Sequence, residues 1–278
     1  MAIEQKLDHL KSLLREMQRA VLAYSGGVDS SLLLAAAAEV LGPGLVAVTA
    51  VSETYPSGEL LSAREFARSR NVNLVVLHTE ELASEAYARN APDRCYHCKK
   101  ELFAKLRGIS EAEGISVLIE GSNTDDLKDH RPGRTAALEF GLRSPLVEAG
   151  LSKKEIRELA HSLNLPVWDK PSLACLSSRI PYGTRITPGL LRTIQAAEDR
   201  LRVLGFGQVR VRHHGDTARI ELDSAEFGRV LQGDAAARIV ATLKELGYTY
   251  VCLDLEGYRT GSMNEGMLKE KLHSAGGK

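Results

Sequence analysis

A short glycine turn between an apolar strand and a helix constrains this chain more than any other feature. Residues 20–24 have the composition of a buried strand, and residues 29–41 have the broad apolar face of a helix. Between them runs the sequence SGGVDS, Ser25–Ser30. Its two glycines allow a tight turn, so that several backbone N–H groups and the helix N-terminus point at one anion. With hydroxyl donors from its two serines, the turn predicts a phosphate-binding loop.

The loop is not a Walker loop, because that motif ends in Gly-Lys followed by Ser or Thr. A purely structural alternative remains. In it the glycines form an ordinary turn, and Asp29 or Ser30 is the N-cap of the following helix.

Strand-like and helix-like segments alternate through the first 120 residues. The expected strands are residues 20–24, 45–51, 73–78 and 116–120, and the expected helices are residues 1–17, 29–41, 57–70 and 99–113. Such alternation predicts parallel strands joined by right-handed helical crossovers, with ligands at the carboxyl ends of the strands. The fold class expected is therefore α/β, a doubly wound, mostly parallel, Rossmann-like sheet.

A Pro-, Gly- and Ser-rich stretch interrupts this pattern after residue 168. We expect a first domain at 1–170, a linker at 171–187 that contains Cys175, and a smaller C-terminal α+β domain at 188–278. In the second domain the expected helices are 189–204, 225–231 and 235–246, and the expected strands are 208–214, 218–222 and 248–254.

Charge and hydropathy exclude several classes of protein. The 36 basic and 36 acidic residues give a formal net charge of zero, so no global attraction to nucleic acid or an anionic membrane is expected. No apolar run approaches the ~20 residues of a membrane span, and charged residues occupy the N-terminus where a signal peptide would be apolar. Four cysteines are too few for a disulfide scaffold. We therefore expect a cytoplasmic protein with no nucleic-acid or membrane partner.

Three of the cysteines have spacings that suggest metal chemistry. Cys95 and Cys98 are three residues apart at a helix start, so they share a face, and Cys175 lies in the expected linker. Three thiolates around an iron–sulfur cluster leave one iron open to an exogenous sulfide. The alternatives are a zinc site with His97 or His130 as fourth ligand, a thioredoxin-like redox pair, and buried unreactive cysteines. Cys252, in an apolar run, is expected in the core.

Beyond the loop, several sequence blocks resemble known families. The loop itself resembles the pyrophosphate-binding motif of the PP-loop ATP pyrophosphatases, which cleave ATP between the α and β phosphates. Four further blocks are similar to the LarE family: EGSNTDD at 120–126, DHRPG at 129–133, RSPL at 143–146 and PSLACLSSRIPYG at 171–183. The resemblance covers nearly the whole chain. LarE proteins make the pyridinium thiocarboxylates of the nickel-pincer nucleotide, the cofactor of lactate racemase.

The resemblance implies an ATP- and Mg²⁺-dependent sulfur transferase. Some LarE proteins have only the cysteine that matches Cys175, and they give up its sulfur and leave dehydroalanine. Others resemble this chain in having a Cys-x-x-Cys as well, and there three cysteines hold a [4Fe-4S] cluster. We favour this second version, with Cys95, Cys98 and Cys175 as ligands, and keep the sacrificial version as an alternative.

The resemblance and the strand ends together imply the nucleotide site. The expected ATP-binding residues are Ala23, Ser25, Gly26, Gly27, Asp29, Ser30, Thr49, Ala50, Gly121, Asp125 and Asp126. Asp29 is also expected to be essential for catalysis. Asp125 and Asp126 are expected to bind Mg²⁺ or the ribose, and the alternative is that one of them is a helix N-cap.

A substrate that carries a phosphate and carboxylates needs cations. Arg210 and Arg212 are two apart on an expected strand, so both guanidiniums point to one face, for which an exposed strand face is the structural alternative. The resemblance implies that the substrate contacts are His97, Ser178, Arg179, Glu198, Arg210, Arg212 and Glu221. For the two glutamates, surface positions on a helix and a hairpin are the alternative.

The implied reaction adenylates a carboxylate of pyridinium-3,5-biscarboxylic acid mononucleotide and converts it to a thiocarboxylate. The implied partners are this mononucleotide, a sulfide donor and further copies of the chain in a homo-oligomer such as a hexamer. Three competing interpretations are a PP-loop tRNA thiolase, an amide-forming synthetase, and a non-enzymatic iron–sulfur or zinc carrier. A tRNA thiolase would need a broad basic face, and a carrier would not need the glycine loop.

Overall fold

The computed structural model of the protein describes residues 2–56, 58–127, 132–171, 174–259 and 262–264. The chain forms two compact units, Met1–Leu173 and Ala174–Lys278, called unit 1 and unit 2 below. His130, one of the zinc ligands considered above, lies outside the described residues, as does the rest of 128–131.

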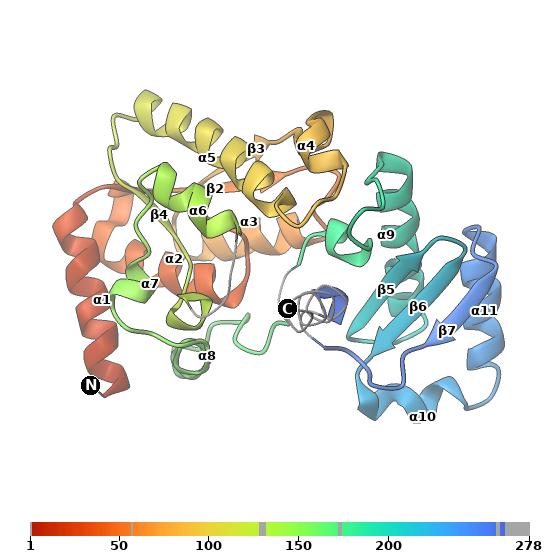
Figure 1. The fold of residues 1–278 in the computed structure, drawn as a ribbon. Coiled ribbons are helices and arrows are strands. Elements are labelled where there is room, and N and C mark those ends of the chain that lie inside the picture. The colour runs from red at the N-terminus through yellow and green to blue at the C-terminus, as the bar shows by residue number, and fades with distance from the viewer. Residues whose placement is uncertain (1, 57, 128–131, 172–173, 260–261, 265–278) are drawn as a thin grey trace, which may run out of the picture. The chain divides into compact units, whose positions relative to one another are not determined.

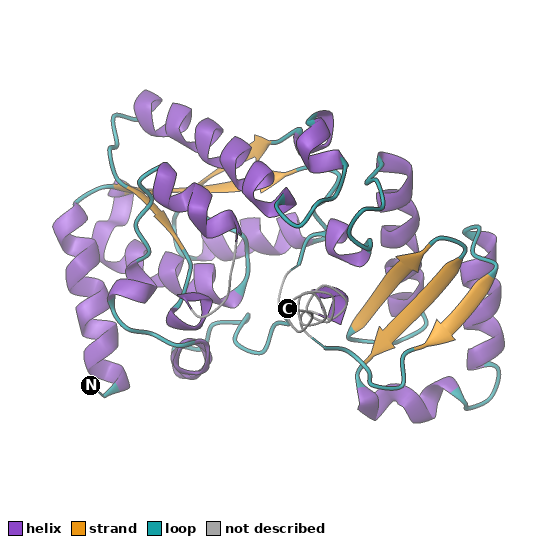
Figure 2. Cartoon of the chain, in the orientation of Figure 1, coloured by secondary structure: helices purple, strands orange, loops and turns teal. Residues whose placement is uncertain are grey.

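Unit 1 is built on a four-stranded parallel sheet (Figures 1 and 2). Its strands are β1 (Ala20–Ala23), β2 (Leu45–Val51), β3 (Asn73–His78) and β4 (Leu118–Glu120). The order is β3-β2-β1-β4, so the chain adds strands on one side of β1 and then crosses to the other side with β4. The expected α/β fold with a parallel sheet is confirmed.

Helices cover both faces of this sheet. They are α1 (Ile3–Met17), α2 (Val28–Leu41), α3 (Glu59–Ser69), α4 (Glu85–Ala88), α5 (Arg94–Ala112), α6 (Pro132–Glu139), α7 (Pro145–Glu148) and α8 (Lys153–Ser162). Helix α5 begins at Arg94, five residues before the expected start at 99, and the preceding Pro92-Asp93 is a helix-start signal that could have located it. The short 3-10 turns of unit 1 are Gly42–Gly44, Glu81–Ala83 and Thr124–Leu127.

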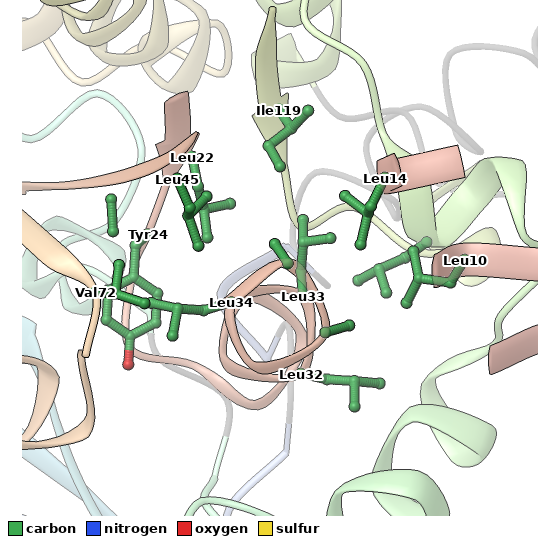
Figure 3. Packing of buried hydrophobic residues seen from close by; sticks show 14 of the residues in the cluster. Leu10, Leu14, Leu22, Tyr24, Leu32, Leu33, Leu34, Leu45, Val72 and Ile119 are labelled. Carbon is green, nitrogen blue, oxygen red and sulfur yellow. The ribbon is translucent and has the colours of Figure 1, made fainter. Parts of the chain in front are cut away.

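The core explains why the sheet is doubly wound. Helix α2 is apolar on all sides, and Leu32, Leu33 and Leu34 are fully buried because α1, α8 and the sheet surround it (Figure 3). On the opposite face of β1 and β2, Val21 and Val46 belong to a second cluster formed with α5 and α6. Each strand is therefore apolar on both faces, as buried parallel strands usually are.

Unit 2 contains a small mixed sheet of order β5-β6-β7, as expected for an α+β unit. Its strands are β5 (Val209–His214), β6 (Thr217–Leu222) and β7 (Tyr250–Leu253), and its helices are α9 (Pro188–Val203), α10 (Phe227–Val230) and α11 (Ala235–Glu245). β5 and β6 form an antiparallel hairpin, whereas β7 runs parallel to β6. Further 3-10 turns are Leu176–Arg179, Ser224–Glu226 and Ser262–Asn264.

The two faces of the unit 2 sheet differ in chemistry. Val211 and Ile220 lie in a cluster with Leu201 of α9 and Leu243 of α11, which forms the core of the unit. The expected core position of Cys252 is wrong, because this side chain is exposed. Neighbours along a strand point to opposite faces, so Cys252 lies on the side away from the core.

None of the helices in the described part of the chain combines the length and the apolar character that a membrane span requires.

Candidate functional site

The predicted phosphate loop joins β1 to the first turn of α2. Gly26 has a φ of +77°, which glycine adopts without strain. The Ser30 hydroxyl closes the loop, since it accepts from the Ser25 N–H at 3.3 Å and donates to the Gly27 carbonyl at 3.1 Å. The N-cap of α2 is Gly27, which has no capping side chain, so the alternative with Asp29 or Ser30 as N-cap is wrong. The N–H groups of this first turn lack intrahelical acceptors and are available to an anion.

The loop follows β1 at the switch point of the sheet, between β1 and β4. Open α/β sheets usually bind ligands at such a point, outside the carboxyl ends of the strands. Gly121, directly after β4, approaches the loop closely. A Cβ at this position would lie 3.0 Å from the Ser30 nitrogen and 3.1 Å from its Cα, both of them backbone atoms. A larger residue at this position would have to push the Ser30 backbone away by a few tenths of an ångström.

Three of the expected ATP-binding residues lie at the ends of β1 and β2. Ala23 ends β1, and Thr49 and Ala50 stand near the end of the neighbouring β2. The Thr49 hydroxyl is buried and donates to the Tyr24 carbonyl at 2.9 Å. This bond ties the exit of β1 to β2 and so fixes where the loop begins.

Asp29 has two partners that the sequence analysis did not identify. Its carboxylate accepts from the Asn123 side-chain amide at 3.2 Å and forms an ion pair with Lys153, the first residue of α8. Asp126 makes a local bond, since it accepts from the Asn123 N–H at 3.0 Å, whereas Asp125 accepts from the N–H of Lys153 in the first turn of α8 at 2.9 Å. The segment after β4 is thereby tied to both α8 and the loop.

A second lysine that sequence reasoning missed also reaches the loop. The Lys170 ammonium donates to the Gly26 carbonyl at 3.3 Å and to the Glu59 carboxylate at 2.6 Å. The Tyr55 hydroxyl donates to the Ser25 carbonyl at 3.3 Å. No local sequence pattern marks these residues, because they come from separate segments that only the fold brings to the loop.

Cys95 and Cys98 lie in the first turn of α5, with Cys95 exposed and Cys98 half-buried. His97 turns to Asp93, with its Nε2 at 3.2 Å from a carboxylate oxygen. A Cβ at Gly133 would lie 3.7 Å from the Cys95 carbonyl, so α6 packs closely on this turn. Within the described part of each unit, no three His, Cys, Asp or Glu side chains form a metal site.

Cys175 is the second residue of unit 2, and its backbone is held by Arg179. It is half-buried and precedes the 3-10 turn Leu176–Arg179. Arg179 is 1% exposed, and its Nη1 donates to the carbonyls of Ala174 at 2.7 Å and Cys175 at 3.0 Å, and to the Ser178 hydroxyl at 3.0 Å. Arg179 therefore fixes the backbone on either side of the Cys175 side chain.

Glu198 of α9 supplies the counter-charge for Arg179. Its two oxygens accept from Arg179 Nε at 2.8 Å and Nη2 at 3.1 Å, and it also accepts from Arg202 and from the Val211 N–H. Burial raises the pKa of this carboxyl, but the positive charge of Arg179 and its hydrogen bonds, together with Arg210 and Arg202, outweigh burial and hold the pKa below its usual value. The side chain is fully buried, so the surface alternative is wrong.

Arg210 and Arg212 occupy the polar face of the unit 2 sheet, and both are buried, so an exposed strand face is excluded. Arg212 donates to the Ser178 carbonyl at 3.1 Å and to Glu221 at 2.7 Å. Its Nε has no partner among the described residues. Arg210 lies over the Tyr258 ring at 5.3 Å, and burial, followed by the charge of Arg179, lowers its pKa.

Glu221 is fully buried, which excludes the surface alternative for this residue as well. It accepts from Ser262 at 2.7 Å and approaches Arg219 at 3.4 Å, two contacts that the sequence did not reveal. Hydrogen bonds and ion pairs in unit 2 therefore connect Cys175, Ser178, Arg179, Glu198, Arg212 and Glu221, and Arg210 lies on the same face of the sheet as Arg212.

Comparison with known proteins gives full-length and partial matches, although no family model matches the chain. The chain is 39% identical to the pyridinium-3,5-bisthiocarboxylic acid mononucleotide synthase of Lactiplantibacillus plantarum, over 95% of each chain. It is 44% identical to an uncharacterised protein of Synechocystis, over 96% of this chain and all of the other. A tRNA-specific 2-thiouridylase of Azorhizobium caulinodans matches at 31% identity, over 55% of this chain and 49% of its own length.

Proposed function

Because the chain belongs to the LarE family of pyridinium-3,5-bisthiocarboxylic acid mononucleotide synthases, we propose that it is an ATP-dependent sulfur transferase. Its substrate is pyridinium-3,5-biscarboxylic acid mononucleotide, and its products are a thiocarboxylate, AMP and pyrophosphate. One observation carries the proposal: the chain combines a glycine phosphate loop with a cysteine whose backbone is held beside buried arginines. The first element suits ATP, and the second suits sulfur transfer to an anionic substrate.

The first step activates a carboxylate. The N–H groups and hydroxyls of Ser25–Ser30 hold the β and γ phosphates of ATP. A substrate carboxylate oxygen attacks the α phosphorus, and the bond from that phosphorus to the bridging oxygen breaks, which releases pyrophosphate. Asp29 is the loop carboxylate suited to hold Mg²⁺, which when bound neutralises phosphate charge.

The second step replaces the activated oxygen. Hydrosulfide attacks the acyl carbon, the bond from that carbon to the AMP oxygen breaks, and one proton is released with AMP. The product is a thiocarboxylate. Arg210 and Arg212, with the Ser178 hydroxyl, bind the phosphate and carboxylate of the mononucleotide. Arg179 keeps the Cys175 segment in one conformation, since it bonds the carbonyls of that segment and is itself paired with Glu198.

The cysteines fit an iron–sulfur group by chemistry. Thiolates are the ligands that such clusters prefer, and Cys95 and Cys98 lie three residues apart near the N-terminus of α5, on one face of the helix. We propose that these two and Cys175 hold a [4Fe-4S] cluster, which when bound offers an open iron to sulfide. A sulfide donor and a homo-oligomeric assembly are further parts of this proposal.

The test uses the anaerobically purified full-length protein. Its iron content and visible spectrum are measured, and AMP, pyrophosphate, thiocarboxylate and intact protein mass are followed with Mg-ATP and the biscarboxylated mononucleotide. We expect several turnovers with added sulfide, an unchanged protein mass, and no thiocarboxylate from Cys175→Ala. Cys252→Ala is the matched control, because this exposed cysteine lies outside the proposed set.

Other outcomes select the alternatives. A single turnover with a protein mass lowered by the elements of hydrogen sulfide would make Cys175 the sulfur donor, since its thioester would eliminate to dehydroalanine. ATP cleavage that depends on tRNA would favour a tRNA thiolase, and ammonia-dependent AMP release would favour an amide synthetase. Thiocarboxylate formed by Cys175→Ala at the wild-type rate would refute both sulfur routes.

A further inference from the structure

The phosphate loop lacks a cation of its own. A triphosphate carries about four negative charges, and enzymes of phosphoryl chemistry neutralise them with lysine, arginine and Mg²⁺. The Walker loop contains its lysine, whereas the loop Ser25–Ser30 contains only the carboxylate of Asp29. A chain that binds ATP at this loop must therefore bring a cation from another segment.

Lys170 is delivered to the loop from 144 residues away in sequence. Its Nζ lies 3.3 Å from the Gly26 carbonyl and 2.6 Å from Glu59, the first residue of α3. An ammonium has three N–H donors, and among the described residues only these two acceptors are filled. One donor is therefore left for a ligand at the loop.

The backbone around Lys170 is held in place by α8. Arg157 of α8 donates from Nη1 to the Trp168 carbonyl at 2.7 Å and from Nη2 to the Lys170 carbonyl at 2.8 Å. The rings of His161 and Trp168 pack edge to face, with 4.6 Å between the ring centroids. Because the main chain is fixed on both sides of this turn, the lysine side chain is pre-positioned at the loop and loses little entropy on binding a ligand.

We infer that Lys170 binds the pyrophosphate part of ATP, the β and γ phosphates that leave in the first step. The inference rests on the proposed use of ATP and adds a residue that supplies part of the positive charge that the loop itself lacks. Glu59 holds the ammonium in the absence of nucleotide. When phosphate arrives, it takes the remaining donor and competes with Glu59, because both are anions near one cation.

The test measures binding of Mg-ATP, Mg-pyrophosphate and AMP to the full-length protein by calorimetry. Lys170→Met removes the charge and keeps the chain length, and we expect roughly 10- to 100-fold weaker binding of ATP and pyrophosphate, the usual loss for one charge-assisted hydrogen bond. AMP binding should change less than about twofold, since AMP lacks the β and γ phosphates. Lys170→Arg should retain most of the ATP affinity. Lys154→Met is the matched control, because Lys154 is a largely exposed lysine of α8 whose nearest carboxylate is 3.9 Å away.

Glu59→Gln separates ligand binding from a merely structural ion pair. Removal of the competing carboxylate should leave the ATP affinity unchanged or higher. If the ion pair were only structural, loss of either partner should weaken ATP binding equally. Glu59→Gln also tests whether Lys170 binds the phosphates of ATP if Lys170→Met does not fold.

Wild-type ATP affinity in Lys170→Met, equal weakening of ATP and AMP, or a weaker ATP affinity in Glu59→Gln would each overturn the inference. A wild-type protein that binds neither ATP nor pyrophosphate would refute the proposed function itself.

Discussion

Replacement of Glu198 by glutamine should destabilise unit 2 strongly while it leaves unit 1 intact. Glu198 is the carboxylate that faces the buried Arg179 guanidinium through two hydrogen bonds, at 2.8 and 3.1 Å. The substitution keeps the size of the side chain and removes its charge. The guanidinium, which is 1% exposed, then has no counter-ion at this position.

The magnitude follows from burial. Removal of one partner from a buried, hydrogen-bonded ion pair costs about 3–5 kcal/mol, because the remaining charge stays out of water. Glutamine still accepts the Val211 N–H and one arginine donor, so the lower end, about 3 kcal/mol, is the expected loss. For a unit of about 100 residues this lowers the Tm by roughly 12–24 °C.

Hydrogen exchange measured by mass spectrometry reads the two units separately in the intact protein. Amides of α9 and β5 that exchange by opening of unit 2 should exchange more than about 100-fold faster in Glu198→Gln, since 3 kcal/mol is more than two decades in an equilibrium constant. Amides of α1 and β1 serve as an internal reference and should not change.

Arg202→Ala is the matched control, because Arg202 also bonds Glu198 but has a side chain that is 37% exposed. Its loss should cost about 1 kcal/mol or less. Equal protection of α9 and β5 in Glu198→Gln and in the wild type would show that burial of this pair does not hold the unit together. The double variant Glu198→Leu with Arg179→Met should recover part of the stability, since both charges of the pair are then removed together.

Further predictions concern the loop and the acid stability of unit 1. Gly121→Ala should weaken Mg-ATP binding by roughly tenfold or more, measured by calorimetry, because its Cβ must displace the Ser30 backbone from 3.0 Å, and unchanged affinity would exclude this contact. Asp29→Ala should lower AMP release by at least about 100-fold in a radiolabelled ATP assay without loss of fold, and retained release would exclude Asp29 from the reaction. A hydrogen bond from Lys6, followed by bonds to the backbone and side chain at the α8 cap, lowers the pKa of Glu155 from 4.5 to about 2. A depressed carboxyl pKa contributes stability above about pH 4.5 that is lost as the pH falls toward 2, so Glu155→Gln should flatten the dependence of Tm on pH in this window. An equally steep dependence in the variant would assign the acid transition to other groups.

Sequence patterns were sufficient for the architecture of unit 1. The period of the apolar residues distinguishes strands from helices, and the alternation of strands with helices is compatible with few topologies. The same holds for the position of Arg210 and Arg212 on one face of β5, because side chains two residues apart on a strand point to the same side. Periodicity does not say which face of a strand is covered, and for this reason the core position expected for Cys252 is wrong.

The sequence by itself determined the alternating α/β order, the position of the glycine loop after the first strand, and the cysteine spacing. These depend on neighbours along the chain, so local sterics and apolar periodicity suffice to read them. Only the tertiary structure decided that Lys153 and Lys170 meet the loop and that Arg179 is paired with a buried glutamate. Such contacts join residues far apart in sequence, and their charges are placed by packing of whole helices, which no local pattern encodes.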